Sequence, residues 1–272
     1  MPPYLSVSTW SLHRALGPIY RDTPEKPDRA PQYPHGEGTL DLLELPRKLA
    51  QFGIRSLEIC HFHLPSLEDS YLREVCGALS GAGVTLFSLL IDDGDITHPQ
   101  HGARDQAWIA GWLEVAGKIG AKNARVIAGK STGAGSLARS KAALQDLMQV
   151  AEANEVNLMT ENWFDVLSTP AAVETVFEGS EGRLGLCFDF GNWKGADKYE
   201  KLAAIAPYAR SCHAKCSFEA DFKPDRADYE RCLDLTKAAG FSGPYTLVYD
   251  GPDDDEWAGL QVEIEMLRPY LS

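Results

Sequence analysis

Eight short apolar runs, each followed by a segment with helical periodicity, constrain the fold of this 272-residue chain more than any other feature. The runs cover residues 5–11, 56–62, 84–92, 124–129, 156–162, 184–190, 210–216 and 245–250. They are nearly continuous rather than alternating, which is typical of parallel strands buried on both faces. No linker or change of composition divides the chain. The pattern predicts a single α/β domain over residues 1–272, a closed (β/α)8 TIM barrel.

Glycines follow several of the helical segments, as expected of helix ends: Gly53, Gly83, Gly120 and Gly240. An open, doubly wound sheet is the alternative fold for such a pattern. Its usual GxGxxG sequence after the first strand is absent, which favours the closed barrel.

One segment interrupts the alternation between the first strand and the first helix. Residues 17–38 contain five prolines and no periodic apolar pattern, which predicts a long loop. In a barrel this loop lies over the C-terminal face of the strands. It could cover a bound ligand, reach the neighbouring subunit of a homodimer, or be a surface loop without a role.

Charge and cysteine content exclude several classes of partner. The net charge is -13 and no cluster of lysine and arginine offsets it, so binding to nucleic acid is not expected. Six cysteines without a CxxC pair fit a reduced, cytoplasmic protein. The N-terminal residues show no basic stretch followed by an apolar run, as a signal peptide would, and the sequence contains no run of 18 apolar residues. We therefore expect a soluble protein without membrane contact.

Polar side chains stand at the ends of the fifth, sixth and seventh predicted strands, where a barrel places its active site. They are Glu161 and Asn162, Asp189 and Asn192, and His213 and Lys215. Carboxylate and imidazole ligands suit Mn, Zn, Fe, Co or Mg without selecting among them. The eighth strand offers Asp250 as a further ligand, or none if Val248 occupies the metal position. The sequence therefore predicts a divalent cation site.

Three further side chains are candidates for contact with a substrate. Glu58 points into the barrel, where a carboxylate needs a partner such as Lys215, an arginine or substrate hydroxyls. His61 could donate a hydrogen bond to the substrate, although histidines in exposed loops are commoner. Trp10 could form a wall against a sugar, with a place in the core as the alternative. Lys215 could stabilise an oxyanion or pair with a nearby acid.

An acidic segment after the third strand is a weaker candidate. It contains Asp92, Asp93 and Asp95, followed by His98 and His101. The spacing matches no established metal-binding loop. We therefore expect a solvated turn here and not a second metal site.

Motifs along the whole chain resemble one known family. These are TWS in the first strand, LEI in the second, TEN in the fifth, FDFGN in the sixth, His-x-Lys in the seventh and GPYTLVYDG at the eighth. As an ordered set they resemble the xylose isomerase-like TIM barrels of the sugar phosphate isomerase/epimerase superfamily. The resemblance implies a divalent metal held by Glu161, Asp189, His213 and an acid from the eighth strand. The usual glutamate of that strand aligns with Val248, and Asp250 follows two residues later.

These features together predict a metal-dependent isomerase or epimerase of a carbohydrate. A metal bound to a carbonyl and an adjacent hydroxyl stabilises the enediolate, and Glu161 is the candidate base. Asn162 and Asn192 are candidates for holding the substrate. A lyase or dehydratase acting on a keto-sugar or cyclitol at the same site is the alternative. An endonuclease for abasic DNA and a non-catalytic binding protein are less favoured, the first because of the charge.

Overall fold

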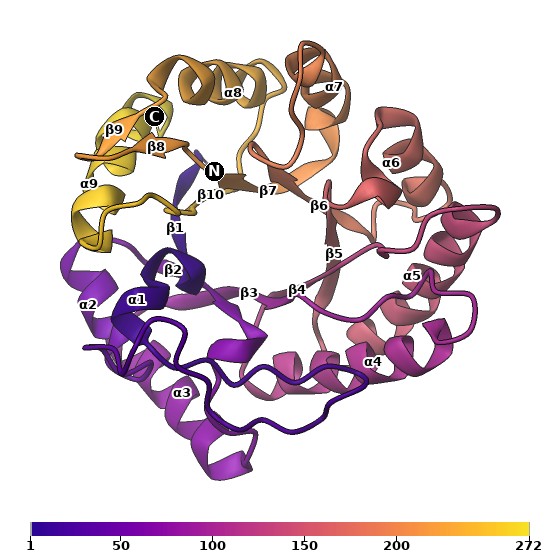
Figure 1. Ribbon diagram of the computed structural model, residues 1–272, viewed down its shortest axis with the longest axis horizontal. Helices are drawn as coiled ribbons and strands as arrows, with labels where there is room; N and C mark the ends of the chain where they lie inside the picture. Colours follow the sequence, from indigo (N-terminus) through magenta and orange to yellow (C-terminus); the bar gives the residue numbers. More distant parts are fainter. Residues whose placement is uncertain (1, 272) are drawn as a thin grey trace.

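The computed structural model describes residues 2–271, and its centre is a closed barrel of eight parallel strands (Figure 1). The order around the barrel is β1-β10-β7-β6-β5-β4-β3-β2. These strands are β1 (Tyr4–Ser8), β2 (Ser56–Cys60), β3 (Thr85–Ile91), β4 (Asn123–Val126), β5 (Asn157–Glu161), β6 (Gly185–Asp189), β7 (Ala209–Ala214) and β10 (Pro244–Leu247). Every residue of β2, β4, β6 and β10 is buried, which explains their continuous apolar pattern. The predicted fold is confirmed.

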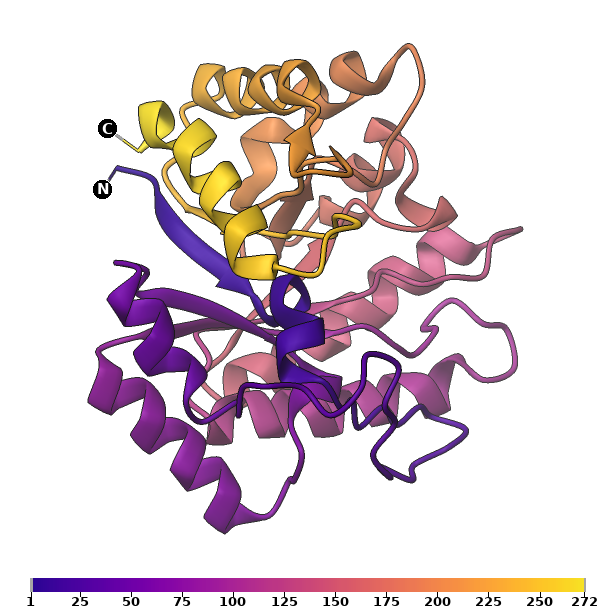
Figure 2. The same ribbon diagram turned by 60° about the vertical axis from the view of Figure 1, so that its left-hand side comes forward.

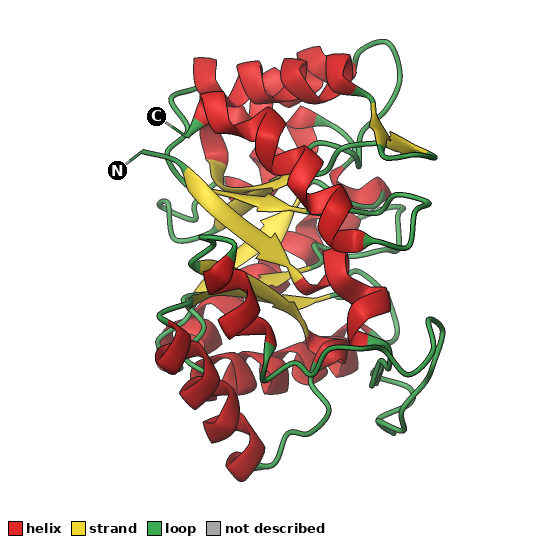
Figure 3. Ribbon diagram, turned by 90° about the vertical axis from the view of Figure 1, so that its left-hand side faces the viewer, coloured by secondary structure: helices red, strands yellow, loops and turns green. Residues whose placement is uncertain are grey.

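The helices surround the barrel as an outer ring (Figure 1), and the side view shows helices above and below the strands (Figure 3). They are α1 (His13–Leu16), α2 (Leu45–Gln51), α3 (Asp69–Ala82), α4 (Gly102–Lys118), α5 (Ser136–Ala153), α6 (Pro170–Phe177), α7 (Lys198–Ile205), α8 (Arg226–Ala238) and α9 (Glu256–Leu267). Gly83 ends α3 at φ 63°, a left-handed conformation that glycine adopts without a Cβ clash. A short hairpin of β8 (Phe218–Glu219) and β9 (Lys223–Pro224) follows β7.

The first and last strands are shorter than the sequence pattern predicts. β1 ends at Ser8, and a 3-10 turn over Thr9–Leu12 leads into α1. β10 ends at Leu247. The Ser11 hydroxyl explains both ends, because it donates to the Leu247 carbonyl at 2.8 Å and accepts from the Tyr249 amide at 3.0 Å. One side chain thereby replaces the backbone ladder where β1 and β10 meet.

The long segment of residues 17–38 follows α1 rather than the first strand directly, because the buried Glu256 carboxylate stabilises this extra helix. That carboxylate accepts from the amides of Arg14 at 2.8 Å and Ala15 at 2.9 Å. Figure 2 shows the segment in indigo, and both chain ends on the opposite side of the molecule. An antiparallel bridge between Ile19 and Gln32 folds it back on itself.

The hydrophobic core lies between the barrel strands and the helices. Leucines from several barrel strands are almost fully buried in this core, among them Leu57, Leu89, Leu158, Leu186 and Leu247. Within residues 2–271, no helix combines the length and apolar composition needed to cross a membrane.

Candidate active site

A cavity of about 260 Å³ opens at the carboxyl ends of the barrel strands. Its polar wall is formed by Ser8, Arg21, Asp92, Arg125, Glu161, Asp189, Asn192, His213 and Lys215. Its apolar wall is formed by Trp10, Cys60, Phe62, Leu90, Trp163 and Val248. A concave site that combines apolar walls with a few convergent polar groups is the usual form of an active site in this architecture.

Three side chains from neighbouring strands meet in this cavity. Glu161 ends β5, Asp189 ends β6, and His213 is paired with Asp189 in the register of β6 and β7. The His213 Nδ1 atom lies 3.7 Å from Glu161 Oε2 and 3.8 Å from Asp189 Oδ2. All three residues are at least 95% buried. The structure thus places His213 close to two of the other predicted ligands, Glu161 and Asp189, whereas the compact group of donors in the described residues is Glu161, Cys187 and His213.

Hydrogen bonds fix the remaining polar atoms of this cluster. Asn192 Nδ2 donates to Glu161 Oε1 at 2.7 Å. The backbone amides of Gly191 and Asn192 both donate to Asp189 Oδ1 at 2.7 Å. His213 Nε2 lies 2.8 Å from a Glu58 carboxylate oxygen. Each of the three side chains therefore turns one uncommitted atom toward the others.

This arrangement fits a divalent cation. The buried Glu161 Oε2 atom makes no hydrogen bond within residues 2–271, and with Arg125 Nε 3.0 Å away it can still accept a further ligand. Metal-binding histidines commonly hold a carboxylate on their second nitrogen, the position that Glu58 has beside His213. Cys187 supplies a further donor, since its sulfur lies within 4.8 Å of donor atoms of Glu161 and His213.

The pKa values of His213 and Asp189 are both raised, so the cluster retains protons in the absence of a bound cation. Burial lowers the pKa of His213, but the facing Cys187, Glu161 and Glu58 outweigh it and hold the pKa well above its usual value. Burial and the nearby Glu161 raise the pKa of Asp189 to about 6. A cation would compete with these protons, so metal affinity should rise with pH.

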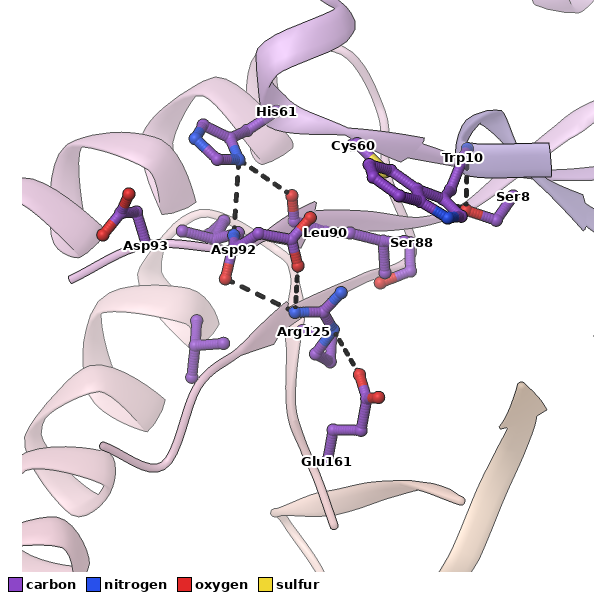
Figure 4. Close-up of polar contacts among 12 residues, drawn as sticks. Ser8, Trp10, Cys60, His61, Ser88, Leu90, Asp92, Asp93, Arg125 and Glu161 are labelled. Carbon is purple, nitrogen blue, oxygen red and sulfur yellow. Dashed lines mark hydrogen bonds and ion pairs between the residues drawn. The ribbon is translucent and has the colours of Figure 1, made fainter. Parts of the chain in front are cut away.

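Arg125 is a site residue that we did not predict. Its Nη1 atom lies 2.5 Å from Asp92 Oδ1, and its Nε atom lies 3.0 Å from Glu161 Oε2, an ion pair without hydrogen-bond alignment (Figure 4). Burial raises the pKa of Asp92 and of Glu161, but Arg125 outweighs it and both pKa values are lowered. The available signal was an arginine inside the otherwise apolar run of residues 124–129, since a buried guanidinium requires a carboxylate partner.

The acidic segment after β3 differs in part from the expected solvated turn. Asp92 lies in the cavity wall with its side chain 11% exposed. Asp95 does form a turn, accepting hydrogen bonds from Thr97 and from the amides of Lys130 and Ser131. Burial raises the pKa of Asp95, but these donors outweigh it and lower the pKa below its usual range.

The end of β10 presents an apolar side chain to the cavity. Val248 lines the wall, whereas the half-exposed Asp250 lies outside it and accepts from Lys215 Nζ at 2.9 Å. Burial lowers the pKa of Lys215, but Asp250 outweighs it and raises that pKa. The structure therefore does not place Asp250 with Glu161 and His213.

The other predicted site residues have separate positions. Trp10 lines the cavity. Glu58 contacts His213 and Thr246 instead of the expected Lys215 or arginine, and it does not line the cavity where substrate hydroxyls would lie. His61 is fully buried behind the wall, with its ring 5.0 Å from that of Trp112, and is therefore not exposed to a ligand.

Asn162 is also buried, and it links neighbouring strands instead of lining the cavity. Its side chain donates to the Asp189 carbonyl at 3.1 Å and accepts from the Asp189 amide at 2.8 Å. It therefore positions Asp189.

Comparisons with known proteins agree with this architecture. The sequence matches the family described as xylose isomerase-like TIM barrel over residues 46–270. No curated protein sequence matches the chain.

Several solved structures share the fold at low sequence identity. A xylose isomerase-like TIM barrel protein from Mycobacterium smegmatis, in complex with magnesium, is 16% identical with a TM-score of 0.68, covering 100% of this chain and 98% of its own. The IOLI protein with a bound zinc atom is 14% identical with a TM-score of 0.70, covering 99% of both chains. D-psicose 3-epimerase from Clostridium cellulolyticum H10, solved with D-tagatose, is 16% identical with a TM-score of 0.64, covering 86% of this chain and 94% of its own.

Proposed function

The chain belongs to the xylose isomerase-like TIM barrel family, and on that premise we propose that it is a metal-dependent isomerase or epimerase of a sugar or sugar derivative. The observation that carries the proposal is the convergence of Glu161, Asp189 and His213 at the ends of β5, β6 and β7. The solved relatives support it, because one is an epimerase of ketoses and two hold a metal ion.

Glu161, Asp189 and His213 would hold the metal, with Glu58 fixing the orientation of the imidazole. When bound, a divalent cation supplies positive charge beside a carbonyl and an adjacent hydroxyl of the substrate, which favours the enediolate. Cys187 is the alternative third donor, and a sulfur ligand would favour zinc over magnesium.

Glu161 is suited to remove the carbon-bound proton of the substrate. Burial alone would raise the pKa of Glu161. Arg125 and His213 have the opposite and larger effect, so the pKa is lowered and the carboxylate is ionised near neutral pH. Asn192 and Arg125 hold this carboxylate in place. Lys215 reaches the same cavity and can donate a hydrogen bond to an oxyanion of the substrate.

A lyase or dehydratase is the second candidate function, and Val248 is the observation that favours it. Epimerisation by two bases needs a second basic group opposite Glu161, and Val248 cannot accept a proton. The ion pair of Lys215 and Asp250 borders the cavity instead, where Lys215 could protonate a leaving hydroxyl. Removal of a proton by Glu161 would then lead to elimination.

Metal analysis and solvent deuterium uptake test the proposal together. We expect about one divalent cation per chain and uptake of deuterium into ketoses, inosose-type cyclitols or keto-glycosides. Glu161→Gln should keep the fold, judged by circular dichroism, and lower the exchange rate about 10²- to 10⁴-fold, because an amide cannot act as a base. A metal-free protein, or exchange that persists in Glu161→Gln, would contradict the proposal. Loss of water from the substrate without epimer formation would select the lyase.

A further inference from the structure

Arg125 has one guanidinium nitrogen that the protein does not use. Nη1 and Nε contact Asp92 and Glu161, and the arginine is 97% buried. Nη2 makes no hydrogen bond to any residue in the described range 2–271. Figure 4 shows this nitrogen directed away from both carboxylates, on the side of Trp10. Unlike the buried Nε, Nη2 is open to the cavity, where a ligand can accept its hydrogen bond.

A second arginine reaches the same cavity from the segment of residues 17–38. Arg21 lines the cavity with its guanidinium carbon 4.9 Å from the ring centre of Phe62. It forms no ion pair within the part of the chain that the structure describes. Lys215, by contrast, has Asp250 as its partner. Arg21 is therefore a cation at the cavity that no carboxylate contacts directly, although its charge helps Arg125 to lower the pKa of Asp92.

The residues on both sides of Arg21 are anchored to the barrel. The Tyr20 amide donates to the Phe62 carbonyl at 2.7 Å. The buried Asp22 accepts from Trp108 Nε1 at 2.9 Å and is paired with Arg29. These contacts fix the backbone at Arg21, so that its side chain is held near the cavity at little entropic cost to binding.

We propose that the substrate carries an anionic group, a carboxylate or a phosphoryl group, that binds between Arg21 and Arg125. Guanidinium groups offer planar, charged donors that match the oxygens of both groups. The proposal rests on the proposed function for its reacting end: the carbonyl side lies at Glu161, Asp189 and His213, and the anionic end points toward the segment 17–38. With a chain charge of -13, these local cations also offset repulsion of an anionic substrate.

Three ketoses that differ only at carbon six test this site: D-fructose, D-fructuronate and D-fructose 6-phosphate. Affinities are measured by isothermal titration calorimetry on the whole chain with magnesium chloride. We expect at least one anionic sugar to bind about tenfold more tightly than D-fructose, and this preference to fall as salt is added. The sugar that shows the preference identifies the group as carboxylate or phosphoryl.

Two variants assign the preference to these arginines. Arg21→Gln should remove it without weakening D-fructose binding, whereas Arg47→Gln, the same change at an exposed position of α2, should preserve it. Arg125→Lys should reduce the preference, with thermal unfolding as the check that the variant is folded. Equal affinity for all three sugars, binding of none of them, or a preference that survives in Arg21→Gln overturns the proposal. Because these measurements need no turnover, failure of deuterium exchange would reject the proposed reaction alone and leave the anion site standing.

Discussion

At the scale of single residues, the chemistry of the site depends on which side-chain atoms remain available to a ligand after the others have formed hydrogen bonds within the protein. Glu161 and Asp189 each use one carboxylate oxygen for hydrogen bonds within residues 2–271. His213 uses Nε2 for Glu58. The atoms that remain are Glu161 Oε2, Asp189 Oδ2 and His213 Nδ1, and all three residues are buried. Arg125 offsets part of the negative charge at Glu161, and a bound cation or protons must offset the rest, so metal binding at this site should be sensitive to loss of any one ligand.

Metal content distinguishes the three candidate donors from Cys187. We expect His213→Ala and Asp189→Ala each to weaken metal affinity by more than about 100-fold, since even outer contacts of metal ligands contribute 10- to 100-fold. Cys187→Ser should retain the metal, because Asp189 Oδ2 lies 3.8 Å from the imidazole and can act as the third donor. Elemental analysis after dialysis measures all three variants. Loss of the metal in Cys187→Ser with retention in Asp189→Ala would exchange the two roles.

Arg125 allows a test of the buried ion pairs. Arg125→Leu should destabilise the fold by about 3–5 kcal/mol, because Asp92 and Glu161 would remain buried without a counter-ion. The matched control is Lys130→Leu, which removes the partly exposed ion pair with Asp93 at 2.8 Å and should cost about 1 kcal/mol or less. Urea denaturation with both variants gives the two free energies. Equal losses of unfolding free energy in the two variants would show that the ion pairs of Arg125 stabilise the fold no more than the partly exposed pair of Lys130 and Asp93.

At the scale of secondary structure elements, the strands were predictable because burial on both faces imposes a continuous apolar run. The strand ends were not, because they depend on distant contacts such as the Ser11 hydroxyl between Leu247 and Tyr249. The positions of Glu161, Asp189 and His213 follow from the rule that strand ends share one face of a barrel.

Two misplacements at the site have the same cause. His61 is buried because Trp112 of α4, about 50 residues away in sequence, packs over it. Arg125 and Asp92 become a pair only because β3 and β4 are neighbours in the sheet. The spacing of residues within one segment of the sequence predicts neither the packing of Trp112 on His61 nor the pairing of Arg125 with Asp92.

The end of β10 offers a test at the element scale. Val248 lines the cavity, whereas Asp250 is committed to Lys215. Val248→Glu should therefore add a ligand and tighten metal binding, and Asp250→Asn should leave the metal affinity within about twofold, since a surface pair contributes little. Metal titration followed by calorimetry measures both. A loss of affinity in Asp250→Asn as large as that in His213→Ala would return Asp250 to the ligand set.

At the scale of the whole molecule, the structure combines an acidic exterior with buried histidines that the fold keeps neutral. Burial lowers the pKa of His61 to about 4 and that of His63 to about 3, both below the ordinary value near 6.5. Because the unfolded chain takes up these protons at a higher pH than the folded chain, stability is lost as the pH falls below about 6.5. The loss continues until the pH reaches the folded-state pKa.

His63 gives a quantitative form of this prediction. Between pH 7 and pH 5 the unfolded imidazole becomes protonated while the buried one stays neutral, so this residue alone should remove about 2 kcal/mol from the free energy of unfolding. His63→Asn, whose amide can keep the contact with the Thr9 hydroxyl, should reduce the pH-dependent loss by that amount, even if it lowers stability at pH 7. His101→Asn, the same change at an exposed position, is the control for the substitution itself. Urea denaturation of the three proteins at both pH values decides the matter: parallel losses in wild type and His63→Asn would mean that His63 is not held neutral by the fold.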